Sequence, residues 1–137
     1  MAEYSGTPLA KKLGIKEGDA IALFNAPHGV EALVGDLPPG VTIRRGSRHA
    51  GPFDVILIFA TSLKDLKPQF DAARALMAPA CGMWCCWPKQ ASGVETDLTE
   101  DSIRVHALAA GLVDNKVCAI DDTWSGLRIV IRTKDRP

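Results

Sequence analysis

Residues 53–88 read FDVILIFATSLKDLKPQFDAARALMAPACGMWCCWP, a strand–helix–strand pattern. Residues 53–60 are apolar except for Asp54, as in the central strand of a parallel sheet that is covered by helices on both faces. Residues 82–87 are also apolar on both faces, and this second run ends at Pro88. We therefore predict two buried parallel strands that are joined by a helix.

The connecting segment predicts an amphipathic helix. Ser62 is a candidate N-cap, because Asp65 follows three residues later as in a capping box. Pro68 lies inside the segment, so we expect the helix either to kink there or to start anew near Lys67. The expected buried stripe consists of Leu63, Leu66, Phe70, Ala73 and Met77.

The N-terminal part predicts short elements. Thr7 as cap, Pro8 in the first turn and Gly14 as terminator favour a brief helix. The other expected elements are strands at 19–25 and 41–45, a helical turn at 29–35 and a basic, glycine-containing loop at 46–52.

The C-terminal part predicts a helix and a β-hairpin. Asp97 or Thr99 can cap the helix, whose buried stripe is expected to be Val105, Leu108, Ala109 and Leu112. Strands at 113–120 and 127–132 flank a turn at 121–126, so they should pair in antiparallel fashion.

These elements predict one α/β domain over residues 1–137, with a doubly wound, mostly parallel sheet and a C-terminal antiparallel hairpin. Residues 1–17 are expected to be a helical lead-in, residues 18–132 to hold the sheet and helices, and residues 133–137 to be a frayed tail. The hairpin edge could pair with a second copy of the chain, although Arg128 and Arg132 would discourage this at the last strand.

The composition excludes several classes of protein. Sixteen basic and sixteen acidic side chains give a net charge of zero, which removes any global field for nucleic acid or an anionic membrane. No apolar run approaches the roughly 20 residues of a membrane span, and the N-terminus does not resemble a secretory signal. We therefore expect a cytoplasmic protein that binds neither membrane nor nucleic acid.

The four cysteines are Cys81, Cys85, Cys86 and Cys118. We interpret them as small buried hydrophobic residues and predict no metal site, with a redox or metal role as the alternative. As strand neighbours, Cys85 and Cys86 should point to opposite faces of the sheet, which is poor geometry for sharing a metal.

The order of elements from residue 53 onwards resembles the later half of a Rossmann-type methyltransferase domain. Residues 76–82, LMAPACG, are a degenerate version of that family's L-x-P-G-G segment, and the closing hairpin resembles its reversed last strand. The resemblance implies a truncated methyltransferase-like fold. However, the loop at 25–29 has one glycine, the second strand ends in Arg44 and Arg45 instead of an acid, and one strand–helix unit is absent before Phe53. We therefore predict no cofactor, S-adenosylmethionine (SAM) included.

Three strings of sequence resemble a family of small bacterial proteins of unknown function. These are YSGTPLAKKLGIK at 4–16, WPKQASG at 87–93 and DTWSGLR at 122–128. The resemblance implies a bacterial, cytosolic protein and brings no established activity with it.

The expected ligand site lies at the carboxyl ends of the parallel strands, where the winding of the sheet reverses. Each candidate also has a structural explanation: Ser62 can cap a helix, Trp124 can plug the core and Lys89 can be a solvated loop residue. The candidates are Asn25, His28, Thr61, Ser62, Lys89, Ser92 and Trp124.

A basic cluster offers a second candidate site. Arg44 and Arg45 could hold a phosphate together with Arg48 and His49, although such a cluster can also be a solvated surface.

Two functions follow from these observations. The first is a non-catalytic module that binds a small molecule or a protein; the alternative is a small enzyme or nucleotide- or phosphate-binding protein that uses the polar rim.

Overall fold

A computed structural model describes residues 8–46 and 50–137. The expected cap Thr7 and two members of the basic cluster, Arg48 and His49, lie outside the described residues. Within the described residues, no helix is both long enough and apolar enough to cross a membrane.

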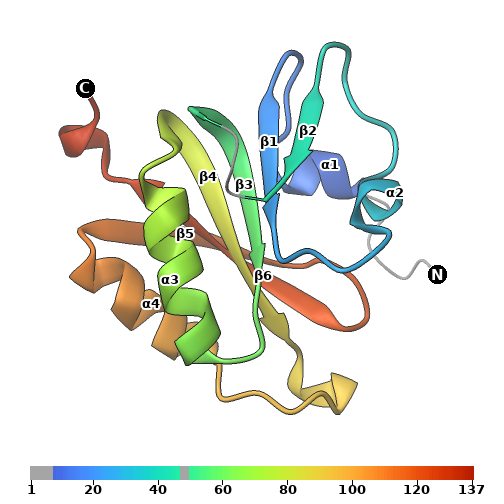
Figure 1. Cartoon of the computed structure of the whole chain (residues 1–137), viewed down its shortest axis with the longest axis vertical. Helices are drawn as coiled ribbons and strands as arrows, with labels where there is room; N and C mark the ends of the chain where they lie inside the picture. Colours follow the sequence, from blue (N-terminus) through green and yellow to red (C-terminus); the bar gives the residue numbers. More distant parts are fainter. Residues whose placement is uncertain (1–7, 47–49) are drawn as a thin grey trace.

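The described residues contain a six-stranded sheet with the strand order β2-β1-β3-β4-β6-β5. Only β6 runs against its neighbours, because it pairs in antiparallel fashion with both β4 and β5 (Figure 1). The prediction of a mostly parallel sheet with a closing antiparallel hairpin is therefore confirmed. The strands are β1 (Ala20–Phe24), β2 (Thr42–Arg45), β3 (Phe53–Phe59), β4 (Met77–Pro88), β5 (Leu112–Ala119) and β6 (Trp124–Ile131).

Helices cover both faces of the sheet, which confirms the doubly wound architecture (Figure 1). The front face in Figure 1 carries α3 (Leu63–Arg74) and α4 (Glu100–Ala109). The opposite face carries the short helices α1 (Leu9–Lys12) and α2 (Val30–Val34). Each face has its own apolar core, so the central strands are buried on both sides.

Strands β3 and β4 divide their side chains between the two cores. On β3, Ile56 packs in the α3–α4 core and Leu57 in the α1–α2 core. On β4, Cys85 and Cys86 are buried on opposite faces, as their adjacency predicted. Asp54, the polar residue of β3, accepts a 2.8 Å hydrogen bond from the backbone N–H of Ala20.

Helix α3 is continuous from Leu63 to Arg74 with Pro68 inside it, and the expected second start near Lys67 does not occur. Ser62 caps the helix as predicted, because its Oγ accepts a hydrogen bond from the backbone N–H of Asp65. The expected stripe was wrong at its end. Met77 lies outside the helix as the first residue of β4, where it pairs with Phe53.

The predicted buried face of α4 was wrong. The buried side chains of the helix are Ile103 and Ala107, whereas Val105 is 67% exposed and Leu108 47% exposed. Of the expected stripe, Ala109 is exposed too, and Leu112 is buried but belongs to β5. The reason is that Val105 and Leu108 are apolar but lie on the solvent side once Ile103 packs against the sheet.

The C-terminal hairpin differs from the prediction in the bounds of its turn and of its second strand. Asp121 Oδ1 accepts hydrogen bonds from the backbone N–H groups of Thr123 and Trp124, so the turn is tight and β6 already begins at Trp124. Strand β6 lies inside the sheet, so Arg128 does not protect an edge, and β5 is the edge strand instead. In the segment predicted as a tail, residues 133–135 form a 3-10 turn.

Candidate functional site

The winding of the sheet reverses between β1 and β3, and in open α/β sheets this is where ligands bind. Asn25 follows β1 directly and adopts a left-handed backbone conformation, with φ of 55°. Its side-chain Nδ2 donates a 2.8 Å hydrogen bond to the carbonyl oxygen of Phe59, the last residue of β3. The carboxyl ends of the two strands are thus tied together by a side chain of the chain itself.

Arg45, at the end of β2, holds the loop that follows β1. Its guanidinium donates hydrogen bonds to the carbonyl oxygens of Ala26 (2.9 Å) and Pro27 (3.1 Å). The same group forms a two-pronged ion pair with Glu31 of α2, at 2.6 and 2.8 Å. All three guanidinium nitrogens therefore have partners within the protein. Its neighbour Arg44 is exposed on the same strand.

The ion pair with Arg45 predicts an unusual titration of Glu31. The hydrogen bond from Arg45 is the main cause that lowers the pKa of Glu31 from 4.5 to about 2. A depressed folded-state pKa stabilises the fold fully above the unfolded value, and this contribution is lost as the pH falls from about 4.5 towards 2. Titration of the side-chain carboxyl by NMR should show this low pKa. In the Arg45→Gln variant, the pKa of Glu31 should return towards 4.5. An unchanged pKa of Glu31 in that variant would contradict the ion pair with Arg45.

The remaining rim candidates take structural positions or lie in solvent. Ser92 Oγ donates to the carbonyl oxygen of Lys89 (2.7 Å) and accepts from the backbone N–H of Val94 (3.1 Å). The backbone N–H of Lys89 donates to the carbonyl of Thr123 at 2.7 Å, which joins the end of β4 to the hairpin turn. Thr61 and His28 are exposed.

Trp124 packs on the end of the sheet. Its ring lies edge-to-face against Phe59, with the ring centroids 5.1 Å apart. The structure therefore brings Asn25 and Trp124 together at one residue, Phe59, through its carbonyl and its ring respectively. Within residues 8–46 and 50–137, the other predicted site residues form no hydrogen bond or ring contact with Asn25 or Trp124 among those described.

A pocket of about 330 Å³ lies at the carboxyl end of β4, beside the N-terminus of α4. Its apolar wall is made by Trp87, Pro88 and Leu98, and hydroxyl, amide and carboxylate groups provide the polar part. Such a combination of flat apolar surface and a few polar groups is typical of small-molecule sites. The polar lining residues are Gln90, Thr96, Thr99 and Glu100.

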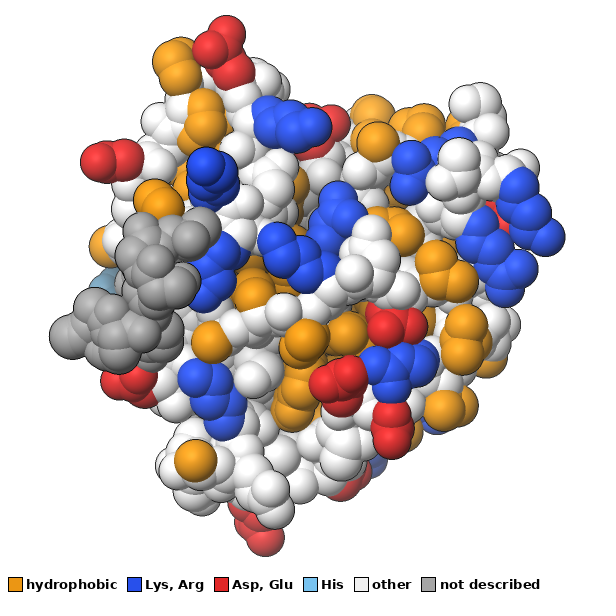
Figure 2. Space-filling view, turned by 180° about the vertical axis from the view of Figure 1, so that it is seen from behind, with side chains coloured by type: hydrophobic (Ala, Val, Ile, Leu, Met, Phe, Trp, Pro, Cys, Tyr) orange, Lys and Arg blue, Asp and Glu red, His pale blue; other side chains and the backbone are white. Residues whose placement is uncertain are grey.

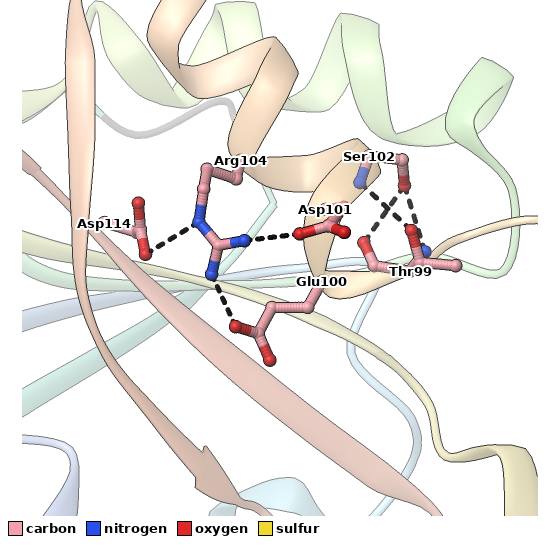
Figure 3. A network of polar contacts seen from close by, with 6 residues as sticks. All are labelled: Thr99, Glu100, Asp101, Ser102, Arg104 and Asp114. Atoms are coloured by element: carbon pink, nitrogen blue, oxygen red, sulfur yellow. Dashed lines mark hydrogen bonds and ion pairs between the residues drawn. The ribbon is translucent and has the colours of Figure 1, made fainter.

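A network of polar contacts lies on the α4 side of this pocket (Figure 3). Thr99 and Ser102 form a reciprocal capping box, with 3.0 Å between each side-chain oxygen and the backbone nitrogen of the other residue. Glu100 is held by Arg104, whose guanidinium also contacts Asp101 (2.6 Å) and Asp114 (3.1 Å). The carboxylate of Glu100, which lines the pocket, is therefore ion-paired with Arg104.

The sequence pattern predicted a site around Lys89 and Ser92, whereas the pocket is lined by their neighbours Trp87 and Gln90, which were not predicted. One feature of the sequence did indicate this pocket. Thr99 is a candidate N-cap, and a helix that follows a parallel strand begins at the carboxyl edge of the sheet. The contribution of residues 96–100 depends on how the connection from β4 folds back, which no local pattern indicates.

Three of the four cysteines are buried and do not have the features of reactive thiols. All four are unpaired, and burial raises the pKa of the Cys85 thiol to about 12. Burial also raises the pKa of Cys81 to about 12 and that of Cys86 well above its usual value. Thiols of this kind stay protonated and behave as small apolar side chains.

Solved structures of methyltransferases share this architecture. The chain superposes on a SAM-dependent methyltransferase from Aquifex aeolicus with a TM-score of 0.60 and 12% identity, over 88% of this chain and 87% of that one. The chain has a methyltransferase-like Rossmann fold. The DhpI–SAH complex matches with a TM-score of 0.56 and 8% identity, over 80% of this chain and 75% of that chain.

A third similar structure is magnesium protoporphyrin IX methyltransferase (ChlM) from Synechocystis PCC 6803 with bound SAM. It matches with a TM-score of 0.55 and 9% identity, over 90% of this chain and 74% of that chain. No protein-family model matches the chain, and neither does any curated protein sequence. At these identities, the similarity describes the methyltransferase-like fold and no activity.

The residues at the switch point of this methyltransferase-like fold do not fit SAM. A cofactor there would need backbone donors and acceptors in the loop after β1, and the carbonyls of Ala26 and Pro27 already each accept a hydrogen bond from Arg45. Pro27 has no N–H to offer, and Asn25 has its side-chain amide bonded to Phe59. At the end of β2, where a carboxylate would receive ribose hydroxyls, the chain has the basic pair Arg44–Arg45.

Proposed function

We propose that this chain is a non-catalytic binding module on a methyltransferase-like scaffold. The observation that carries the proposal is the closed switch point, where Asn25 bonds to the end of β3 and Arg45 clamps the loop after β1. A loop held from two sides cannot open towards a cofactor without breaking these bonds. The scaffold thus offers surfaces and pockets for binding, while the loop after β1 is hydrogen-bonded to side chains of the chain itself.

A second candidate function is that of a small enzyme or ligand-binding protein that uses the pocket at the end of β4. The volume of about 330 Å³ and the mixed lining of Trp87, Gln90 and Glu100 favour a small ligand with one flat apolar face and hydrogen-bonding groups. In this second candidate function, the ligand binds at the carboxyl edge of the sheet, at β4, which is one strand away from the switch point between β1 and β3.

We also propose a cytoplasmic location and membership of the small bacterial family whose strings the sequence resembles. Four unpaired thiols, three of them buried, fit a reducing compartment.

The first proposal predicts that SAM and S-adenosylhomocysteine do not bind. Isothermal titration calorimetry should give no heat beyond dilution, and the Trp124 indole N–H signal should not move in a ¹⁵N-labelled sample, because Trp124 packs on Phe59 at the switch point. Saturable binding of either compound, with a shift of that signal, would overturn the proposal.

The indole signals also separate the two candidates. The chain has three tryptophans, and Trp87 lines the β4 pocket while Trp84 is buried. A fragment library that shifts Trp87 alone would support the ligand-binding candidate. Trp87→Phe and Trp124→Phe variants assign the signals.

A further inference from the structure

The face opposite α3 and α4 carries a hollow lined by basic side chains, which we call the basic hollow. It lies between the C-terminal end of α1 and strands β5 and β6 and has a volume of about 200 Å³. Figure 2 shows this side of the molecule, with Lys and Arg side chains gathered near the middle of the face. The lining residues are Lys11, Lys12, Gly14, Asn115, Lys116 and Arg128.

The basic hollow is held together by contacts between segments that are far apart in the sequence. The buried indole of Trp84 donates a 3.2 Å hydrogen bond to the carbonyl oxygen of Leu13, just after α1. Lys116 Nζ, on β5, donates to the carbonyl oxygen of Lys12 at 3.3 Å. These bonds dock the end of α1 against the sheet, so the lysines of α1 are held beside Lys116 of β5.

Arg128 lines the hollow, and its guanidinium lies against Gly82 of β4. A Cβ atom at Gly82 would come within 2.5 Å of Arg128 Nε and 3.0 Å of its Cζ, so the guanidinium occupies the space above the glycine. One edge of the group is held by a 3.3 Å hydrogen bond from Nη1 to Asn115 Oδ1. The position of this guanidinium therefore depends on the absence of a side chain at residue 82.

The lining of the basic hollow carries positive charge and, among the described residues, no acidic side chain. Within residues 8–46 and 50–137, no carboxylate forms an ion pair with Arg128. Desolvation is the main cause that lowers the pKa of Arg128; Cys81 opposes it, and the positive charge of Arg136 is a smaller cause in the lowering direction. Four cationic side chains thus line one small hollow on a chain whose net charge is zero.

We propose that the basic hollow binds the phosphate group of a small phosphorylated ligand. A planar guanidinium and flanking ammonium groups match the charge and geometry of a phosphate oxyanion, with Arg128 forming the two-pronged contact and Lys116 and Lys11 the flanking ones. A volume of about 200 Å³ has room for phosphate or pyrophosphate, which is why we favour a small ligand over a nucleic acid strand. The site is distinct from the switch point, so it does not depend on the function proposed above.

The test is isothermal titration calorimetry of the full chain with inorganic pyrophosphate and inorganic phosphate. Arg128→Gln should weaken pyrophosphate binding by about tenfold or more, since one charge-assisted contact is lost. Gly82→Ala should also weaken it several-fold with no change in net charge, because the new methyl group displaces the guanidinium. Arg44→Gln, on the exposed strand β2, is the matched control and should bind like the natural chain.

Several results would overturn the proposal. One is the absence of pyrophosphate and phosphate binding by the folded natural chain, and another is an equal loss in Arg44→Gln and Arg128→Gln. Binding that Gly82→Ala leaves unchanged would also contradict it. A single-stranded oligonucleotide that binds more tightly than pyrophosphate, with a steep loss as salt is raised, would show that the face serves nucleic acid instead. Circular dichroism confirms that each variant is folded; if Arg128→Gln is not, Gly82→Ala and Lys116→Gln carry the test.

Discussion

Replacing Trp84 by alanine is expected to lower the free energy of unfolding by about 3–5 kcal/mol, the range for removing a buried tryptophan side chain. Trp84 is fully buried in the α1–α2 core. Its ring lies so close to Gly126 on β6 that a Cβ there would be 3.1 Å from Trp84 Cε3. Its indole N–H also bonds to the carbonyl of Leu13. The substitution therefore removes a large apolar contact and releases the end of α1.

Chemical denaturation followed by circular dichroism measures this loss. Trp84→Phe is the matched variant: it keeps an aromatic ring in the core but loses the bond to Leu13, so its destabilisation should be clearly smaller. Since domains of this kind are stable by only about 5–15 kcal/mol, the alanine variant should lose a large part of its stability. Equal midpoints and slopes for the natural chain and Trp84→Ala would show that this residue does not hold α1 to the sheet.

Replacing Ile103 by alanine is expected to cost about 2–5 kcal/mol, whereas Val105→Ala should change stability by no more than about 0.5 kcal/mol. Ile103 is completely buried against the sheet, with Phe70 of α3 in the same core. Val105, two residues further along α4, points to solvent. The pair tests which face of α4 is buried, which is where the sequence pattern misled the prediction.

The same denaturation experiment distinguishes the two orientations of α4. A larger loss for Val105→Ala than for Ile103→Ala would mean that the helix is rotated and that its predicted stripe was right. Leu108→Ala serves as a second exposed control, because Leu108 is nearly half exposed. Neither control removes a residue of the capping box, so both leave the start of the helix intact.

The central strands could be predicted from the sequence, because the pattern of apolar residues that marks them lies within a few consecutive residues. Residues 53–60 and 82–87 are apolar on both faces, and a strand with this property has to lie between two layers of helices. The cap at Ser62 was predictable for a similar reason, since the hydroxyl and the N–H that it accepts from are three residues apart. Edges of elements were less predictable: β4 begins at Met77, five residues before its apolar run.

Roles that depend on distant partners could not be predicted from local pattern. Arg45 looked like a phosphate ligand because its neighbours in sequence are basic, but its donors meet Glu31 and two loop carbonyls that the fold brings to it. Asn25 looked like a free polar group of the rim, and only the pairing of β1 with β3 places the Phe59 carbonyl within its reach.

The order of apolar runs, caps and turns was enough to specify an α/β sheet with helices on both sides and a reversed last strand, because periodicity and capping act over a few residues. The basic hollow needed the tertiary structure. Its lining residues come from separate segments of the chain, among them Lys11, Lys116 and Arg128. The guanidinium of Arg128 fits there only because Gly82, on the neighbouring strand β4, has no side chain. Charge and shape at such a site arise from the packing of elements against each other, which depends on contacts across the whole chain rather than on the pattern of any one segment.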